Sequence, residues 1–510
     1  MSIPIETLSE DDVESLARML HTSVTDTEAA AFAEQINNGL HWYETLDSYG
    51  HAGTEANRVH PTDLQFNPGA KADPLNAFIS KFSLRDTASE DGILSGLSVA
   101  VKDNTAVAGV PLTCGSRIFE SVIPRQNATV VDRLLDEGAE IVGKTNMDEL
   151  AYGPTGETSQ FGPTRHPMDR NRVSGGSSSG SGATVGAGTV DAALGSDTGG
   201  SVRIPAAFCG VVGMKPSWGV VPRSGVVELA YTLDHVGSLA TDVETTAAVL
   251  DAITGRDDRD LSSVRAEFLS DRSFRSAVEN PPDLKELTIG VPEEFFAEDV
   301  EDGVAETIYA ALGRFEEAGV TVTETSIPTV EDAVAVSNAI MVSEFAAAIR
   351  SRGIPFQRNT SYDTVLQDAL ATALSTHGHK LGDIVKRKMV EGEYLLDRYQ
   401  GRHYVRAKNA RRRLETEFEA ALDETDVLVT PTLPTVATEL GEWSADGYGE
   451  NVPLAVNTRP INLVGLPAVT LPAGTHDDLP VGLQCIGSTM EDISTLAIAR
   501  TFERALETTS

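Results

Sequence analysis

The spacing of apolar and polar positions predicts a short helical region at the start of the chain and a larger, mixed region after it. Within residues 8–48, apolar side chains recur at helical intervals at Val13, Leu16, Ala17 and Leu20. Ser9 precedes them as a candidate N-cap. A polar stretch over residues 53–73, with scattered proline and glycine, is typical of a linker. We therefore predict a helical extension and linker over residues 1–75 and one main domain over residues 76–510.

Strand and helix patterns alternate within the main domain. Leu97, Val99 and Val101 point to one side of a short predicted strand. Residues 127–138 have the pattern of a helix that stops at a glycine, and residues 139–143 predict the next strand. Later segments continue the alternation: a long helical region at 392–422, a buried strand at 426–431 and an amphipathic helix at 491–506. This rhythm favours an α/β fold.

The charge balance of the chain changes the picture of its surroundings. Its 510 residues are 41% hydrophobic and hold 40 Lys and Arg against 76 Asp and Glu, a formal net charge of −36. Such a surface stays hydrated, and high salt screens its self-repulsion, so we predict an acidic, halophilic protein. The same charge repels phosphate backbones, and the one run of arginines, residues 411–413, is short. We therefore expect no nucleic acid as a partner.

Cysteine usage and the N-terminal sequence exclude several further classes. Cys114, Cys209 and Cys485 lie far apart and form no CxxC pair, so we expect buried thiols and neither a disulfide framework nor a zinc site. The N-terminus has no basic segment followed by an apolar one, and no apolar run reaches the ~18 residues of a membrane span. We expect a cytoplasmic protein with no membrane contact.

Two short motifs suggest chemistry that their context does not support. Residues 138–145, GAEIVGKT, fit the Walker A pattern, but a phosphate cradle needs a loop where this chain predicts a strand. Residues 176–180 fit the G-x-S-x-G elbow centred on Ser178, yet a polar loop precedes them instead of an apolar strand. Such an elbow also needs a histidine downstream as its base. The nearest one, His235, lies in no sequence pattern that indicates a catalytic base.

Several blocks of the main domain together resemble the amidase signature family. The longest is GGSSSGSGATVGAG, continuing through ALGSDTGGSVRIPAAFCGVVGMKPSWGVVP. LSGLSVAVKDN and GAEIVGKTNMDELAYG precede it, while NTRPINLVGLPAVTLPAG and LPVGLQCIG follow it. The resemblance spans about residues 76–505. It implies a mixed β-sheet core covered by helices on both faces, and hydrolysis of a carboxylic acid amide to the acid and ammonia.

The resemblance also assigns catalytic roles by position. Lys102 corresponds to the family's lysine, Ser177 to its middle serine after a cis peptide bond, and Ser201 to its nucleophile. Ser179 stands where glycine is usual in the family, so Ser178 remains the alternative to Ser177. Backbone donors for the oxyanion are expected at Thr198, Gly199 and Gly200. The acyl pocket is expected to include Ala151, Tyr152, Gly153 and Asn457.

The proposed chemistry sets physical conditions for these side chains. Lys102 can accept a proton only when neutral, so burial must lower its pKa from the usual ~10.4. Ser177 would pass the Ser201 proton to Lys102, and an acyl-enzyme would form on Ser201. No metal or organic cofactor is required. Asp197 and Arg203 flank the nucleophile and are expected to support the loop without taking part in the reaction.

Two relatives within the family compete as models for this chain. One is a free-standing amidase that acts on a small-molecule amide and could form a homodimer. The other is the glutaminase subunit of a tRNA-dependent Asp/Glu amidotransferase. That glutaminase usually carries RQPA and a YDGxRYG segment whose arginine holds the glutamine carboxylate. Here residues 203–206 read RIPA, residues 338–356 lack that segment, and Ala455 stands where the glutaminase has an aspartate. These differences favour the free-standing amidase.

Overall fold

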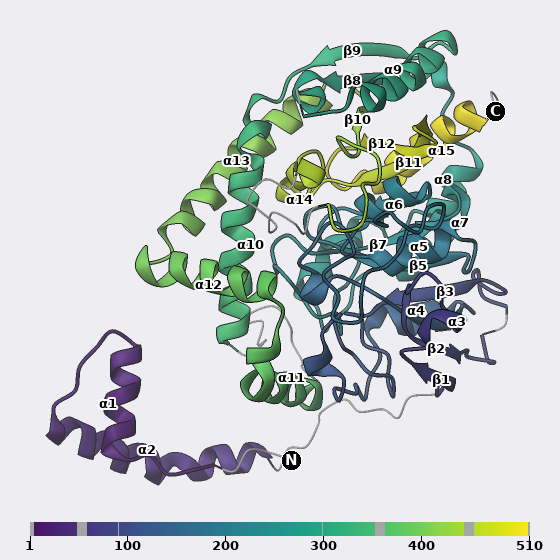
Figure 1. The fold of residues 1–510 in the computed structure, drawn as a ribbon. Coiled ribbons are helices and arrows are strands. Elements are labelled where there is room, and N and C mark those ends of the chain that lie inside the picture. The colour runs from purple at the N-terminus through teal and green to yellow at the C-terminus, as the bar shows by residue number, and fades with distance from the viewer. Residues whose placement is uncertain are drawn as a thin grey trace.

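One large mixed β-sheet runs through the protein (Figure 1). The computed structural model describes residues 5–47, 59–89, 91–297, 299–351, 363–442 and 453–507. In this part of the chain the sheet has 12 strands in the order β1-β2-β4-β3-β5-β7-β6-β11-β12-β10-β8-β9. The strands are β1 Thr62–Phe66, β2 Phe78–Leu84, β3 Ser98–Lys102, β4 Glu140–Thr145, β5 Ala192–Asp197, β6 Val212–Lys215, β7 His235–Ala240, β8 Thr288–Pro292, β9 Thr321–Thr325, β10 Val427–Pro431, β11 Ala468–His476 and β12 Leu479–Ile486.

Helices flank this sheet and extend beyond it (Figure 1). The α-helices are α1 Glu10–Met19, α2 Asp26–Asp47, α3 Gly69–Ala72, α4 Thr129–Asp136, α5 Ser179–Gly186, α6 Arg203–Cys209, α7 Val243–Ile253, α8 Phe274–Glu279, α9 Asp302–Glu317, α10 Ala333–Arg350, α11 Thr364–His377, α12 Asp383–Arg398, α13 Arg402–Leu422, α14 Arg459–Val464 and α15 Asp492–Glu507. The 3-10 helices are η1 Arg117–Phe119, η2 Glu149–Ala151, η3 Leu261–Leu269, η4 Leu284–Glu286, η5 Glu293–Phe296, η6 Pro328–Asp332, η7 Gly378–Lys380 and η8 Pro453–Ala455.

The central strands are buried on both faces, which confirms the α/β class with helices on both sides of a mixed sheet. β3 pairs in parallel with β4 and β5, while β5 and β7 are antiparallel. Val99 and Val101 pack into one core with residues of α4 and α7, whereas Ala100 packs on the opposite face with Ala183 of α5. Because successive strand residues alternate between faces, Lys102 follows Ala100 toward the α5 side.

The predicted local elements are largely present. The side chain of Ser9 accepts a hydrogen bond from the backbone of Asp12 and caps α1, as expected. α4 and β4 occupy the predicted helix and strand around Gly138. Two details differ: the stretch predicted as a linker contains β1, and the long helical region is divided into α12 and α13. Gly401, at φ 69°, separates those two helices.

The N-terminal helices form a hairpin of their own. Val13, Ala29 and Ala33 make a small core between α1 and α2, which lie to one side of the sheet (Figure 1). Among the described residues, Nε2 of His21, which follows α1, lies 3.9 Å from Asp397 Oδ1 of α12 in the main fold. That pair is exposed, so it adds little to stability.

One helical segment is longer and more apolar than the sequence pattern suggested. Pro328–Arg350, comprising η6 and α10, could cross a membrane by length and composition alone. α10 packs against α12, α13 and α14, and 44% of the most apolar window is buried inside the fold. A core helix of a soluble protein passes the same test, so this feature is weak evidence for a membrane span.

Candidate active site

Lys102 ends β3 with its ammonium group completely buried. Its Nζ atom donates hydrogen bonds to Ser177 Oγ at 2.8 Å, to Ser196 Oγ at 2.8 Å and to the Ser196 carbonyl at 3.3 Å. No carboxylate in the described chain lies within ion-pair distance of Nζ. Burial of the charged form lowers the pKa of Lys102 to about 7. A substantial fraction of this lysine is therefore a neutral amine near neutral pH.

Two other buried lysines have different hydrogen-bond partners, although burial also lowers the pKa of Lys215 to about 7. Lys144 of β4 lies 2.8 Å from Asp103 Oδ1 and so has a carboxylate partner. Lys215 of β6 donates to the carbonyls of Pro216 and Leu466, away from any serine hydroxyl. Lys144 also belongs to the Walker A match, whose residues form strand β4 from Glu140 to Thr145. A strand cannot provide the loop of a phosphate cradle, so that motif is a coincidence.

Ser177 lies just before α5, and its position distinguishes it from its neighbour. The Gly176–Ser177 peptide is cis, as the resemblance implied. Ser177 contacts Lys102 as described, whereas Ser178 Oγ donates to the Ser196 carbonyl at 3.2 Å. The Ser179 hydroxyl lies 3.0 Å from Thr164 Oγ1. The geometry therefore favours Ser177 over Ser178 as the serine that serves Lys102.

Ser201 is the most accessible of the three residues assigned to catalysis. It is 9% exposed, while Lys102 and Ser177 are fully buried. The backbone holds it near the middle serine, because the Ser178 N–H donates to the Ser201 carbonyl at 3.3 Å. Among the described residues no hydrogen bond joins the hydroxyls of Ser177 and Ser201. Catalytic hydrogen bonds often tighten only when substrate binds.

The loop after β5 supplies backbone donors, although not all those expected. The N–H groups of Thr198, Gly199 and Ser201 have no acceptor within the part of the chain described here. Gly200 differs from the prediction, because its N–H donates to Asp197 Oδ1 at 2.8 Å. Its φ of +131° also suits glycine alone. The structure thus assigns Gly200 to shaping the loop and leaves the other three N–H groups free to meet an oxyanion.

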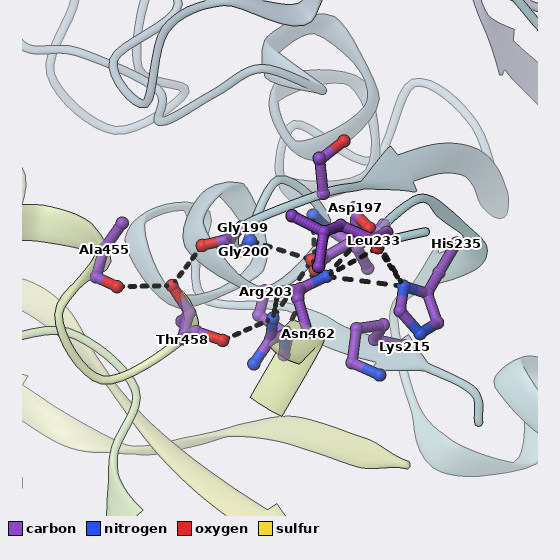
Figure 2. Close-up of polar contacts among 12 residues, drawn as sticks. Asp197, Gly199, Gly200, Arg203, Lys215, Leu233, His235, Ala455, Thr458 and Asn462 are labelled. Atoms are coloured by element: carbon purple, nitrogen blue, oxygen red, sulfur yellow. Dashed lines mark hydrogen bonds and ion pairs between the residues drawn. The ribbon is translucent and has the colours of Figure 1, made fainter. Parts of the chain in front are cut away.

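A buried network around Asp197 and Arg203 fixes that loop (Figure 2). Arg203 binds both carboxylate oxygens of Asp197, with distances of 3.0 and 3.1 Å. It also reaches Gln484 Oε1, the Thr458 carbonyl and Asn462 Oδ1, all within 3.0 Å. Burial acts to raise the pKa of Asp197, but the charges of Arg203 and Lys215 and the hydrogen bonds from Arg203 and Asn462 together outweigh it and hold that pKa below its usual value. The supporting role expected for both residues agrees with these contacts.

Thr198 and His235 lie on the other side of the loop. Thr198 Oγ1 donates to Asp234 Oδ1 at 2.6 Å, and burial raises the pKa of Asp234 to about 6. His235 Nδ1 lies 2.7 Å from the Leu233 carbonyl, and burial lowers the pKa of this ring well below its usual value. His235 makes no described contact with Ser178. A serine–histidine pair at the G-x-S-x-G match is therefore absent from the described residues.

The residues predicted to form the acyl pocket have mixed positions. Ala151 and Tyr152 are nearly buried, and Gly153 is partly exposed. The Tyr152 hydroxyl has no hydrogen-bond partner in the described chain, and its ring meets Phe345 edge-on, with 4.8 Å between centroids. Asn457 is engaged elsewhere, since its side-chain amide donates to the carbonyls of Phe295 and Pro431. Asn457 therefore positions the chain before α14.

Several residues important to the site were not singled out from the sequence, although all but Asp234 lie within the blocks that carry the family resemblance. They are Ser196, Asp234, Thr458, Arg459, Asn462 and Gln484. Asn462 and Gln484 lie more than 200 residues after the loop that they support. The three cysteines behave as predicted: all are free and buried.

Comparison with known proteins agrees with this architecture. A family model described as amidase matches residues 73–496. The A subunit of the glutamyl-tRNA(Gln) amidotransferase of Methanosarcina acetivorans is 42% identical over 82% of this chain and 86% of its own length. The protein of the same name from Natronomonas pharaonis is 44% identical over 81% of this chain and 96% of its own length.

Solved structures of related enzymes share this fold. The crystal structure of the glutamyl-tRNA(Gln) amidotransferase A subunit from Thermotoga maritima superposes on this chain with a TM-score of 0.70. The two sequences are 36% identical. The match covers 86% of this chain and 88% of that one.

These relatives contradict two expectations drawn from the sequence. The free-standing amidase was favoured because residues 203–206 read RIPA, the YDGxRYG segment is missing and Ala455 replaces an aspartate. Relatives that are 42% and 44% identical over most of the chain are instead named as amidotransferase subunits. The exclusion of nucleic acid is also contradicted, because those names include a tRNA. Net charge is a property of the whole chain and does not describe what an assembled complex contacts.

Proposed function

The chain belongs to the amidase signature family and is a hydrolase of amide C–N bonds, and we propose that it is the glutamine-hydrolysing component of an amidotransferase that modifies aminoacyl-tRNA. The observation that carries this proposal is the identity of 42–44% with amidotransferase A subunits, over more than four fifths of the chain. The buried lysine and serines provide the means to cleave the amide of glutamine.

In the proposed reaction, Ser201 is the nucleophile. Its Oγ attacks the amide carbon while its proton moves to Ser177, and the Ser177 proton moves to neutral Lys102. The pKa of about 7 suits this base because the amine must be free to accept and later return a proton. The free backbone N–H groups of the loop donate hydrogen bonds to the negatively charged carbonyl oxygen. Each such donor can increase the rate by roughly a hundredfold.

The second half of the reaction reverses the proton path. Lys102 returns its proton through Ser177 to the leaving nitrogen, so that ammonia departs and an acyl-enzyme remains on Ser201. A water molecule then attacks the ester, giving up one proton through the same two residues. Ser201 recovers its hydroxyl and the carboxylic acid leaves. Every proton in this cycle is carried by residues of the chain.

We propose that this reaction takes place within an assembly with partner subunits. In the assembly, ammonia released at Ser201 would pass to a partner protein that holds the aminoacyl-tRNA. The chain carries a formal net charge of −36. The same charge supports a cytoplasm of high salt, where the acidic surface stays hydrated.

The proposed function is tested by reconstitution in concentrated KCl. The purified chain is combined with the other amidotransferase subunits of its source organism, tRNA charged with glutamate, ATP with magnesium, and labelled glutamine. We expect labelled glutamate and amidated aminoacyl-tRNA to appear together, and both to be lost with Ser201→Ala. Amidation that proceeds without this chain, or an intact assembly that leaves glutamine unhydrolysed, would contradict the proposal.

A further inference from the structure

Arg459, the first residue of α14, lies beside the candidate oxyanion loop as a cation without a partner in the described chain. No hydrogen bond or ion pair of its guanidinium occurs among the described residues, although the chain has 76 acidic side chains against 40 basic ones. Buried or half-buried arginines are normally paired, because an unpaired charge loses hydration without compensation. Arg203, in the same region, has four side-chain and backbone partners.

The side chain of Arg459 lies across Gly199. An ideal Cβ built on that glycine would be 3.3 Å from Arg459 Cγ, 3.8 Å from its Nε and 3.6 Å from Met341 Cε. Gly199 and Arg459 are both partly exposed, and Ser201 is nearby in the same loop. The Arg459 side chain therefore lies against Gly199, whose backbone N–H has no acceptor among the described residues.

Tyr152 supplies a second unused donor in the same region. Its hydroxyl is buried without a hydrogen-bond partner in the described chain. Burial raises the pKa of Tyr152 well above its usual value, so the phenol keeps its proton, and the charge of Arg459 acts on it in the opposite sense. Burial lowers the pKa of Arg459. The Tyr152 ring contacts Phe345, and the Arg459 side chain lies with Met341 against Gly199, so the two groups are related through one turn of α10.

We propose that Arg459 and the Tyr152 hydroxyl bind a carboxylate on the acyl part of the substrate, so that the enzyme selects amides of dicarboxylic acids. A planar guanidinium matches a carboxylate with two parallel hydrogen bonds, and the phenol can donate a third. Met341, Phe345 and Tyr152 belong to one apolar cluster and would line the methylene chain between the two ends of such a substrate. The inference rests on the proposed function, in which glutamine provides this carboxylate.

The test isolates the carboxylate from the rest of glutamine. Glutaramate, the monoamide of glutaric acid, is compared with pentanamide, which has a methyl group in place of the carboxylate. The measured quantity is the ratio of their kcat/KM values for the full chain in concentrated KCl. We expect the ratio to fall about a hundredfold or more in Arg459→Met, because a charged hydrogen-bonded contact is lost. Arg459→Lys should give an intermediate ratio, and Tyr152→Phe a fall of about threefold to tenfold.

A nearby arginine provides the matched control. Arg411 of α13 donates to Glu415 Oε1 at 2.9 Å and is already paired, so Arg411→Met should leave the ratio unchanged. Calorimetric binding of glutarate gives a second readout that does not need turnover: the parent protein should bind it and Arg459→Met should not. Thermal unfolding of each variant establishes that it is folded.

The outcomes separate this inference from the proposed function. If Arg459→Met folds and keeps both the ratio and glutarate binding, the carboxylate site is wrong, whatever the assembled enzyme does with glutamine. If the assembly ignores glutamine while the preference for glutaramate still depends on Arg459, the amidotransferase function is wrong and the carboxylate site stands.

Discussion

The Nζ atom of Lys102 lies 2.8 Å from the Oγ atom of Ser177, and neither side chain is exposed to solvent. The neighbouring Ser178 instead donates its hydroxyl to the Ser196 carbonyl. Two adjacent serines of the same chemistry therefore have different partners. This difference makes the assignment of the relay testable by paired substitutions.

Ser177→Ala should lower kcat for amide hydrolysis by about a hundredfold to ten-thousandfold, the usual contribution of a proton-transfer group. Ser178→Ala should change it by less than about tenfold, because only a hydrogen bond to a carbonyl is lost. Ammonia release under saturating amide measures both. The reverse order, with Ser178→Ala the more damaging variant in a folded protein, would move the relay to Ser178.

The pH dependence of kcat/KM should report the titration of Lys102. Its pKa is lowered to about 7 by burial, and only the neutral amine can accept a proton, so activity should rise with pH through about 7 and then level off. Lys102→Arg should abolish turnover because arginine stays protonated.

Asp234 could also cause activity to rise with pH, because burial raises its pKa to about 6. The variant Asp234→Asn is therefore the control for this profile. If Lys102 sets the profile, Asp234→Asn should retain the rise near pH 7. A profile that is flat between about pH 5.5 and 9 would exclude Lys102 as the base.

The loop glycines should differ in their tolerance of a side chain. A Cβ at Gly200 would overlap Thr458 Oγ1, and its φ of +131° is strained for alanine, so Gly200→Ala should lower the free energy of unfolding by about 1–3 kcal/mol. At Gly199 the nearest atom is the flexible Arg459 side chain at 3.3 Å, and Gly199→Ala should cost less. Denaturant unfolding in concentrated KCl compares them. Equal losses for the two variants would show that the contact with Thr458 does not constrain the loop.

Salt should stabilise the folded chain. With a net charge of −36, screening reduces repulsion within the compact state, and the Debye length falls to about 3 Å in 1 M salt. We expect the thermal midpoint to rise by about 10 °C between dilute buffer and about 3 M KCl. Sucrose, which favours compact states without screening charge, should produce a smaller rise. A midpoint that does not change with KCl would contradict the halophilic interpretation.

The sequence predicted local elements better than it predicted the contacts between distant segments. β3 was predicted by the alternation that ends at Lys102, and α1 by the cap at Ser9, because both signals are local. The direction of the Gly200 N–H depends on Asp197, which depends in turn on Arg203 and Asn462.

The environment of Arg459 also depends on a contact between distant segments and could not be predicted from the sequence. In sequence this residue is an ordinary arginine before a proline, and its lack of a partner in the described chain emerges only when Gly199 is brought against it. The choice of a free-standing enzyme over a component of an assembly was also wrong, because it depended on departures from the usual motifs at residues 203–206, residues 338–356 and Ala455. Absence of a usual motif does not exclude a function that other residues can support.

The most direct test of the account is to trap the acyl group on Ser201. The parent protein and Ser201→Ala are mixed with glutamine in the reconstituted assembly, quenched in acid within milliseconds, digested and analysed by mass spectrometry. We predict one γ-glutamyl ester on the peptide that contains Ser201, with no ester in the variant. A γ-glutamyl group on another residue, or turnover of glutamine by the Ser201→Ala protein at the parent rate, would contradict the proposed mechanism.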